Sequence, residues 1–215
     1  MIRLTAAGPD RIVAVGAHCD DLAIGAGGTL LTLCRTRPGI RVDVLVLSGG
    51  GTEREDEERA ALAAFCPGAD LHLTVLKLPD GRLPAHWEEA KAAVEELRAG
   101  TAPQLVLAPR TDDAHQDHRG LARLMTTAFR DHLVLGYEIA KWDGDLGRPV
   151  AYQPLPEDIA HDKARLLEEH YPSQHHRSWY DREAFLGLAR IRGIECHERY
   201  AEAFAVTKLT LNLGG

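Results

Sequence analysis

Side chains that can bind a metal or move a proton are concentrated in residues 18–21, which read His-Cys-Asp-Asp. They follow the apolar run 11–17, whose β-branched residues and small end are typical of a buried parallel strand. A glycine-rich segment, 24–31, comes next and indicates the entry into a helix. The two aspartates are therefore expected at the carboxyl end of a strand, where open α/β sheets bind their ligands.

A second cluster, residues 113–118, reads Asp-Ala-His-Gln-Asp-His and follows another predicted strand, 104–108. Taken alone, an Asp-Asp pair after a strand is more often a helix N-cap than a metal site. A His-x-x-His pair alone is more often a surface or packing feature. Together at one edge of a sheet, however, the two clusters could supply three histidine and carboxylate ligands and leave a fourth position open. That donor set is typical of catalytic zinc.

The elements that must position these clusters alternate between strand-like and helix-like segments. The predicted strands cover residues 12–15, 41–47, 71–78, 104–108 and 133–139, with a closing strand at 203–213. The first predicted helix ends near Arg35, others cover residues 53–65, 87–99, 120–132, 158–170 and 182–191, and a long loop is expected at 142–156. This order predicts an α/β fold in a single domain, 1–215, with a Rossmann-like, mostly parallel sheet and helices on both faces.

Composition limits the partners of the chain. With 25 basic and 32 acidic residues the net charge is −7, which argues against nucleic acid and against an anionic membrane as partner. No apolar stretch approaches the ~20 residues of a membrane span, and the first residues lack the pattern of a signal peptide. The four cysteines show no paired spacing, so we expect reduced thiols and a cytoplasmic protein.

The motifs, taken in order, resemble those of the PIG-L/LmbE-like zinc-dependent N-deacetylases. Residues 17–21 resemble the family signature A-H-P-D-D, the glycine-rich segment follows it, and residues 115–118 resemble H-P-D-H. Further matches, which extend the resemblance over most of the chain, are R-x-x-E at 54–57, an acidic turn at 78–81, Y-x-S-Q at 171–174 and A-E-x-F at 201–204.

The resemblance implies zinc as cofactor, with His18, Asp21 and His118 as its ligands. It implies Asp20 as the general base that acts on a zinc-bound water. His115 falls on the histidine that stabilises the oxyanion or protonates the leaving amine. Amide hydrolysis needs these functions, and a positioned base typically contributes about 10²–10⁴-fold to the rate.

The same resemblance implies how the substrate is held. Asp117 would orient a neighbouring histidine and favour the protonated form of His115, and Arg54 and Asp80 would bind sugar hydroxyls. Residues 141–181 form a predicted loop-rich segment on the substrate side. The implied substrate is a small amido sugar, and a homo-oligomer is compatible with the family although no interface is evident in the sequence.

Several positions depart from the family pattern. Cys19 and Gln116 replace the two prolines of the signatures, so both loops lose a fixed φ. Leu22 and Ala23 stand where many members carry a glutamate, and Asp113 stands where some place a tyrosine. We expect the apolar pair to mark a subgroup, and the missing tyrosine to alter part of the oxyanion arrangement.

The expected function is therefore removal of the N-acetyl group from a GlcNAc-like sugar or glycoconjugate. One alternative keeps zinc and cleaves a thiol-conjugate amide or another acylated amine. Another is a non-catalytic sugar- or nucleotide-binding domain, although the glycines at 25–28 do not complete G-x-G-x-x-G. Two tryptophans and a tyrosine, Trp142, Trp179 and Tyr180, could stack on a sugar ring or simply pack.

Overall fold

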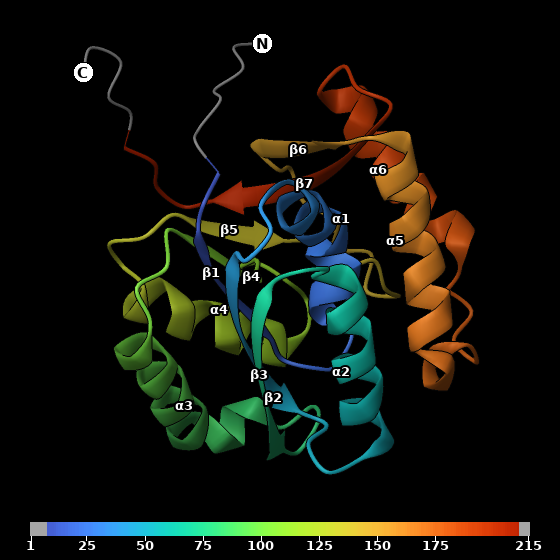
Figure 1. Ribbon diagram of the computed structural model, residues 1–215. Helices are drawn as coiled ribbons and strands as arrows, with labels where there is room; N and C mark the ends of the chain where they lie inside the picture. Colours follow the sequence, from blue (N-terminus) through green and yellow to red (C-terminus); the bar gives the residue numbers. More distant parts are fainter. Residues whose placement is uncertain (1–7, 211–215) are drawn as a thin grey trace.

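A computed structural model describes residues 8–210 of the chain. It contains one seven-stranded sheet in the order β3-β2-β1-β4-β5-β7-β6, with helices on both sides (Figure 1). The strands are β1 (Arg11–Gly16), β2 (Arg41–Ser48), β3 (Asp70–Leu78), β4 (Leu105–Pro109), β5 (Val134–Tyr137), β6 (Ala151–Leu155) and β7 (Tyr200–Val206). The α-helices are α1 (Asp21–Thr36), α2 (Glu53–Phe65), α3 (Trp87–Gly100), α4 (Gln116–Ala128), α5 (Glu157–His170) and α6 (Arg182–Glu195). Two short 3-10 helices are η1 (Leu83–His86) and η2 (Pro172–Gln174).

The sheet is parallel from β3 to β5 and antiparallel at one edge. β1 lies between β2 and β4 and pairs with both in parallel. β7 runs antiparallel to β5, and β6 runs antiparallel to β7. The predicted fold class, a mostly parallel sheet in one α/β unit, is confirmed. Because the strand order reverses at β1 and β4, the carboxyl ends of these two strands flank the place where such sheets bind ligands.

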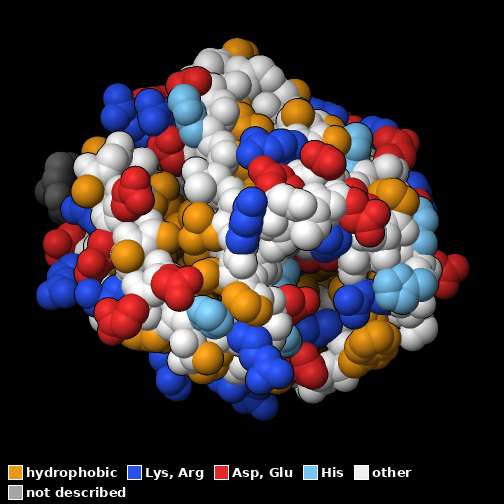
Figure 2. Space-filling model, turned by 90° about the horizontal axis from the view of Figure 1, so that it is seen from below, with side chains coloured by type: hydrophobic (Ala, Val, Ile, Leu, Met, Phe, Trp, Pro, Cys, Tyr) orange, Lys and Arg blue, Asp and Glu red, His pale blue; other side chains and the backbone are white. Residues whose placement is uncertain are grey.

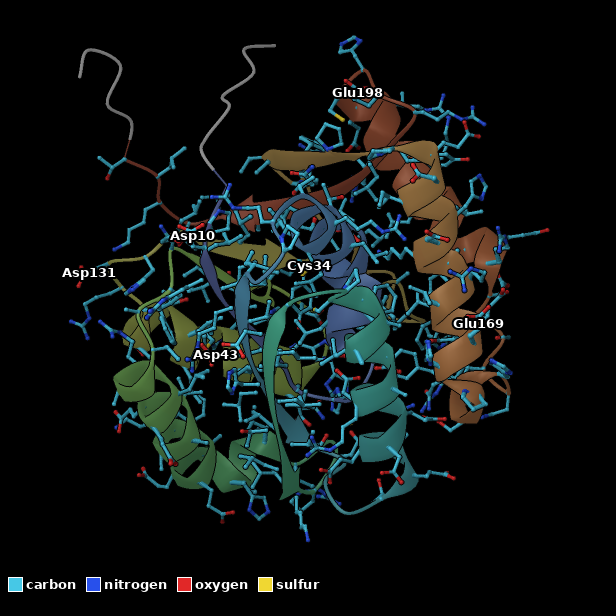
Figure 3. All side chains as sticks on the ribbon, in the orientation of Figure 1. Asp10, Cys34, Asp43, Asp131, Glu169 and Glu198 are labelled. Carbon is cyan, nitrogen blue, oxygen red and sulfur yellow. The ribbon has the colours of Figure 1, made fainter. Side chains whose placement is uncertain are left out.

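The central strand is buried on both faces, which explains its apolar run. Ile12 and Ala14 pack into the larger core under α1, α2, α5 and α6, while Val13 and Val15 pack into the core under α3 and α4. All four are fully buried. Figure 3 shows side chains filling the space between the sheet and both helical layers. This burial fixes the direction of β1 and hence the position of the loop that follows it.

The glycine-rich segment of α1 serves close packing. A Cβ atom on Gly25 would collide with the Tyr137 ring, and one on Gly27 would lie 2.6 Å from Cε1 of Phe65. Tyr137 extends across to donate a hydrogen bond to the carbonyl oxygen of Val15, 2.7 Å away. The glycines therefore let α1 approach its neighbours, and the packing explains them without a bound nucleotide.

A buried ion pair connects the middle of α1 to strand β7, which is next to the edge strand β6. Lys163 on α5 lies 2.6 Å from Glu202 on β7 and also donates to the Ile24 carbonyl. Glu202 in turn accepts from the backbone nitrogens of Gly28 and Thr29, at 2.8 and 2.7 Å. The glutamate of the A-E-x-F motif thus supports the helix that begins at the candidate site.

Replacing Lys163 by methionine is expected to lower the free energy of unfolding by about 3–5 kcal/mol, because Glu202 would remain as a buried charge without its cation. Urea denaturation measures the change. The control is Lys91→Met, which removes an exposed ion pair with Glu95 (2.7 Å) and is expected to leave the free energy of unfolding nearly unchanged. Equal effects of the two substitutions would contradict this role of Lys163.

Some element boundaries differ from the sequence prediction. The expected loop at 142–156 contains strand β6, which pairs with β7 at the edge of the sheet. The helix expected from Gly120 begins four residues earlier at Gln116, so His118 lies in its first turn. The closing strand ends at Val206, and the last residues predicted for it lie outside the described part of the chain. Among the described residues, no helix combines the length and the apolar character needed to cross a membrane.

Candidate active site

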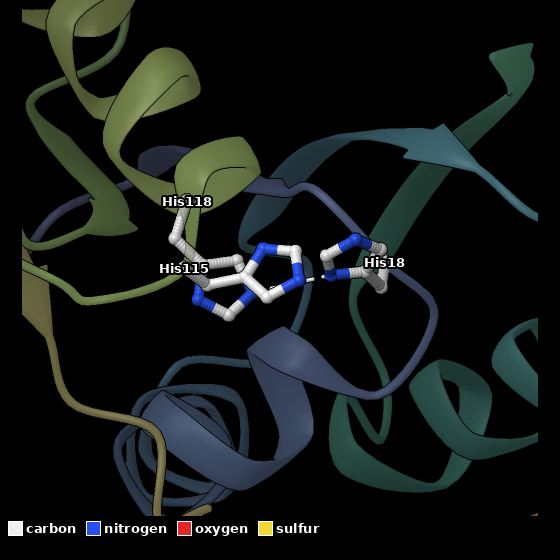
Figure 4. Close-up of side chains that lie close together, drawn as sticks. All are labelled: His18, His115 and His118. Atoms are coloured by element: carbon white, nitrogen blue, oxygen red, sulfur yellow. Dashed lines mark hydrogen bonds between the residues drawn. The ribbon is translucent and has the colours of Figure 1, made fainter. Parts of the chain in front are cut away.

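The two predicted clusters meet at the carboxyl edge of the sheet. His18 lies in the loop between β1 and α1, while His115 and His118 lie at the start of α4, which follows β4. Figure 4 shows the three imidazole rings side by side, with His18 facing the other two. The face that carries this edge is rich in acidic, basic and histidine side chains (Figure 2). Parallel pairing of β1 with β4 therefore brings together residues that are 100 positions apart.

The three predicted ligands lie next to one another. His18 Nδ1 lies 3.1 Å from His118 Nε2, and His118 Nε2 lies 3.3 Å from Asp21 Oδ1. The other oxygen of Asp21 is 3.6 Å from His18 Nδ1. Donors around tetrahedral zinc at bond lengths of about 2.0–2.1 Å are about 3.3–3.4 Å apart. Two imidazoles and a carboxylate at these separations fit a zinc ion.

Backbone contacts fix the Asp21 carboxylate. Its Oδ2 atom accepts hydrogen bonds from the backbone nitrogens of Ala17 and His18, each 2.9 Å away. Burial alone would raise the pKa of Asp21, but the adjacent His118 and His18 hold it well below its usual value. The carboxylate is therefore ionised and preorganised to bind a cation.

Carboxylates contact the outward nitrogens of both histidines. His18 Nε2 lies 3.2 Å from Asp117 and 3.0 Å from Asp80, and His118 Nδ1 lies 3.1 Å from Asp113. Such partners orient a metal-binding imidazole and increase its basicity. Burial opposes the charge of His118, but Asp21 and Asp113 raise its pKa to about 9. This role of Asp113 was not predicted from the sequence, in which its place in the second cluster was the only signal.

Asp20 lies beside the three donors and has an unusual backbone. Its φ of 102° is in the left-handed region, which side chains other than glycine rarely adopt. Its Oδ2 accepts a hydrogen bond of 2.9 Å from Arg54. Burial raises the pKa of Asp20 to about 6, although the Arg54 cation opposes this rise. The carboxylate is thus a buried base that titrates close to neutral pH.

A buried glutamate holds the Asp20 backbone. Glu58 Oε2 accepts from the Asp20 backbone nitrogen at 2.8 Å and from the Tyr171 hydroxyl at 2.7 Å. Burial raises the pKa of Glu58 to about 7. Glu58 was not predicted as a site residue, yet the sequence contains a signal for it, because Glu58 lies on the same helical face as the buried Ala61, Leu62 and Phe65.

Arg54, expected to contact sugar hydroxyls, makes several contacts within the protein. Besides Asp20, it donates to the Cys19 carbonyl oxygen, to Glu57 and to Ser173. The R-x-x-E and Y-x-S-Q motifs therefore meet in one network next to Asp20. This network orients the Asp20 carboxylate, and contact of Arg54 with a substrate stays a prediction.

His115 differs electrostatically from our expectation. Its ring lies 4.8 Å from that of His18 and 4.7 Å from that of His118, measured between centroids. Burial and the charges of His118 and His18 lower the pKa of His115 below its usual value, although Asp117 opposes this change. The Asp117 carboxylate itself faces His18. The structure thus favours the neutral form of His115.

A cavity of about 450 Å³ opens onto this cluster. Asp117, the remaining predicted residue, lies behind His18 and accepts from the backbone nitrogens of Gly81 and Leu83. Segments 139–143 and 174–179 contribute the far wall of the cavity. The predicted site residues that line it are His18, Asp20, Asp21, Arg54, Asp80, His115 and His118.

Comparison with known proteins decides the family. A family model described as GlcNAc-PI de-N-acetylase (PIG-L) matches residues 13–129, more than half of the chain and the part that carries both clusters. The chain belongs to the PIG-L family. The resemblance inferred from the motifs is confirmed, and the family is one of deacetylases, which hydrolyse an amide.

Relatives of the PIG-L chain include named deacetylases. The uncharacterised deacetylase YaiS of Escherichia coli is 27% identical over 170 residues, which cover 74% of this chain and 89% of YaiS. The N,N'-diacetylchitobiose deacetylase of Pyrococcus horikoshii shares the fold with a TM-score of 0.71 and 20% identity, over 93% of this chain and 84% of that structure.

The same fold also occurs in a protein named for another reaction. GalB of Pseudomonas putida, a 4-carboxy-2-hydroxymuconate hydratase, has a TM-score of 0.70 and 16% identity, over 95% of this chain and 99% of its own. The architecture is therefore compatible with more than one chemistry. The reaction of this PIG-L chain must be inferred from its site residues.

Proposed function

We propose that this chain is a zinc-dependent hydrolase that removes the N-acetyl group from a GlcNAc-like amido sugar or glycoconjugate. One observation carries the proposal: a buried carboxylate, Asp20, and a histidine, His115, line the same cavity as the adjacent metal-type donors of His18, Asp21 and His118. A binding protein has no need of a base and a histidine at these positions. Membership in a deacetylase family supports the same reaction.

Residues His18, Asp21 and His118 would hold the metal. When bound, zinc supplies a Lewis acid that increases the acidity of a water and polarises the amide carbonyl. The carboxylates of Asp117 and Asp113 keep the two imidazoles in place from behind. The protein therefore offers a rigid, mixed nitrogen and oxygen donor set.

Asp20 acts as the general base. Its carboxylate accepts a proton from the attacking water while Arg54 fixes its orientation from the side. A pKa near 6 keeps most of the Asp20 carboxylate ionised at neutral pH and makes its conjugate acid strong enough to return the proton. Hydrolysis then yields acetate and the free amine of the sugar.

His115 stabilises the negative charge that develops on the amide oxygen. As a neutral imidazole it donates an N–H hydrogen bond to the oxygen that becomes negative when water adds to the amide carbon. The departing amine receives the proton that Asp20 took from the water, so His115 keeps its own N–H throughout. Asp80, whose side chain is 76% exposed, and Arg54 remain our candidates for contact with sugar hydroxyls.

The test is release of primary amine from N-acetylglucosamine, its disaccharide, and its nucleotide-, inositol- and malate-linked forms. Each substrate is offered to chelator-stripped and to zinc-restored protein. We expect release only after zinc is restored. Release only from a thiol-conjugate amide or another acylated amine would select the amidase alternative. Bound zinc with no release from any acylated amine would overturn the proposal in favour of a binding function.

A further inference from the structure

The cavity contains one arginine that has no acidic partner. Of the three cationic side chains that line it, Arg54 pairs with Asp20, and Lys141 pairs with Asp113. Arg177 lines the same cavity, and within residues 8–210 no carboxylate oxygen lies within 4.0 Å of its guanidinium nitrogens. A cation that faces a cavity without a counter-ion is available to an anionic ligand.

Two contacts hold the Arg177 guanidinium in place and leave donors unused. Its Nε atom donates to Gln174 Oε1 over 2.6 Å, so the two terminal nitrogens remain available. The guanidinium carbon lies 5.8 Å from the centroid of the Trp142 ring, within the range of a cation–π contact. Trp142 is 65% exposed and packs edge-on against Trp179. These aromatic side chains, singled out in the sequence, thus form a support for the arginine at the cavity.

A continuous chain of contacts connects Arg177 to the proposed base. Gln174 is buried, and its Nε2 donates to Ser173 Oγ over 3.0 Å. Ser173 Oγ accepts 2.8 Å away from Arg54, which also binds Asp20. The position of Arg177 is therefore fixed relative to the site of hydrolysis, as a group that recognises the far part of a substrate must be.

We propose that Arg177 binds a carboxylate or phosphate on the aglycone of the substrate, with Trp142 as its support. A guanidinium presents paired N–H donors that match both anions, whereas a neutral aglycone offers no charge with which it could pair. The inference rests on the proposed function for the identity of the sugar. It adds that the preferred substrate is an amido sugar with a negatively charged group attached through its anomeric oxygen.

The test uses three glycosides of N-acetylglucosamine that differ at the anomeric oxygen: methyl, carboxymethyl and phosphate. We expect the zinc-restored wild type to favour a charged glycoside over the methyl glycoside in kcat/KM. In Arg177→Met this preference is expected to fall about 10- to 100-fold, mainly through KM, since one charge-assisted contact is removed. Arg177→Lys is expected to retain part of it. The carboxymethyl and phosphate arms identify which anion is recognised.

The matched control is Arg148→Met, which removes an exposed arginine from the loop between β5 and β6 without touching the cavity lining. We expect the charge preference to survive this change. Equal turnover of all three glycosides by the wild type would overturn the inference while leaving the proposed function intact. The inference is also overturned if Arg177→Met keeps the preference, or if Arg148→Met loses it equally.

Calorimetric titration of chelator-stripped protein with the same glycosides separates the two proposals. Tighter binding of a charged glycoside, lost in Arg177→Met, would support the anion site even if zinc-restored protein released no amine. In that case the proposed function would fail and the inference would stand. Equal binding of charged and neutral glycosides would overturn the inference independently of turnover.

Discussion

Asp20→Asn is expected to lower kcat on an N-acetylated amino sugar by about 10²–10⁴-fold while the protein still binds zinc. The asparagine oxygen can accept the hydrogen bond from Arg54, so the loop is expected to keep its geometry. What is lost is a group that can take the proton of the attacking water. Steady-state kinetics gives kcat, and the zinc content is measured on the same sample.

The control for Asp20→Asn is a buried aspartate away from the cavity. Asp43 on β2 is 7% exposed and binds Arg41, and Figure 3 labels it within the sheet. Asp43→Asn is expected to change stability but not the ratio of turnover to bound zinc. If Asp20→Asn lost zinc together with activity, Asp20 would be a ligand and its assignment as the base would be wrong.

His118→Ala is expected to weaken zinc binding by more than about 100-fold and to abolish turnover in buffered, limiting zinc. Its Nε2 atom lies within 3.3 Å of both other proposed donors, so its removal leaves only a two-ligand site. Asp113 contacts the outward nitrogen of His118 and is not itself a proposed ligand. Asp113→Asn is therefore expected to weaken zinc binding less, by about 10–100-fold. Competition with a chromophoric chelator measures the zinc affinity of the wild type and of both variants.

His115→Ala decides between two ligand sets. One ring nitrogen from each of His18, His115 and His118 lies within 4.8 Å of the other two, so three histidines are an alternative to the set with Asp21. We expect His115→Ala to retain zinc and to lose most of its turnover. Loss of zinc in this variant, with retention in Asp21→Asn, would replace our ligand assignment by the all-histidine set.

Much of the fold was predictable because its strands are buried on both faces. Residues 12–15 are apolar, residues 41–47 are apolar apart from Arg41 and Asp43, and the two segments form β1 and β2 nearly as predicted. Strand β6 was missed because it is a short edge strand that contains Pro154 within a segment rich in glycine and proline. Its pairing with β7 depends on a contact across about 50 residues, which local composition does not reveal.

The site was predictable where residue type and strand position agree. His18 and His118 could be paired because both follow strands that end at the same edge of the sheet. The contacts of Glu58 with Asp20 and of Asp113 with His118 depend on the direction of side chains across separate elements. The lowered pKa of His115 was not predictable either, because it depends on burial and on two neighbouring imidazoles.

The division of the donors between the loops after β1 and β4 has a consequence for folding. His18 and His118 are 100 residues apart, so a chain in which β1 and β4 have not yet paired has no three-donor site. With the proposed ligands, zinc would therefore have little affinity for the disordered chain and would stabilise the finished domain by mass action. The parallel sheet would then have to form before the metal binds, and metal occupancy would be a late sign of correct folding. Retained zinc in a refolded sample would thus report that strands distant in sequence have found their native partners.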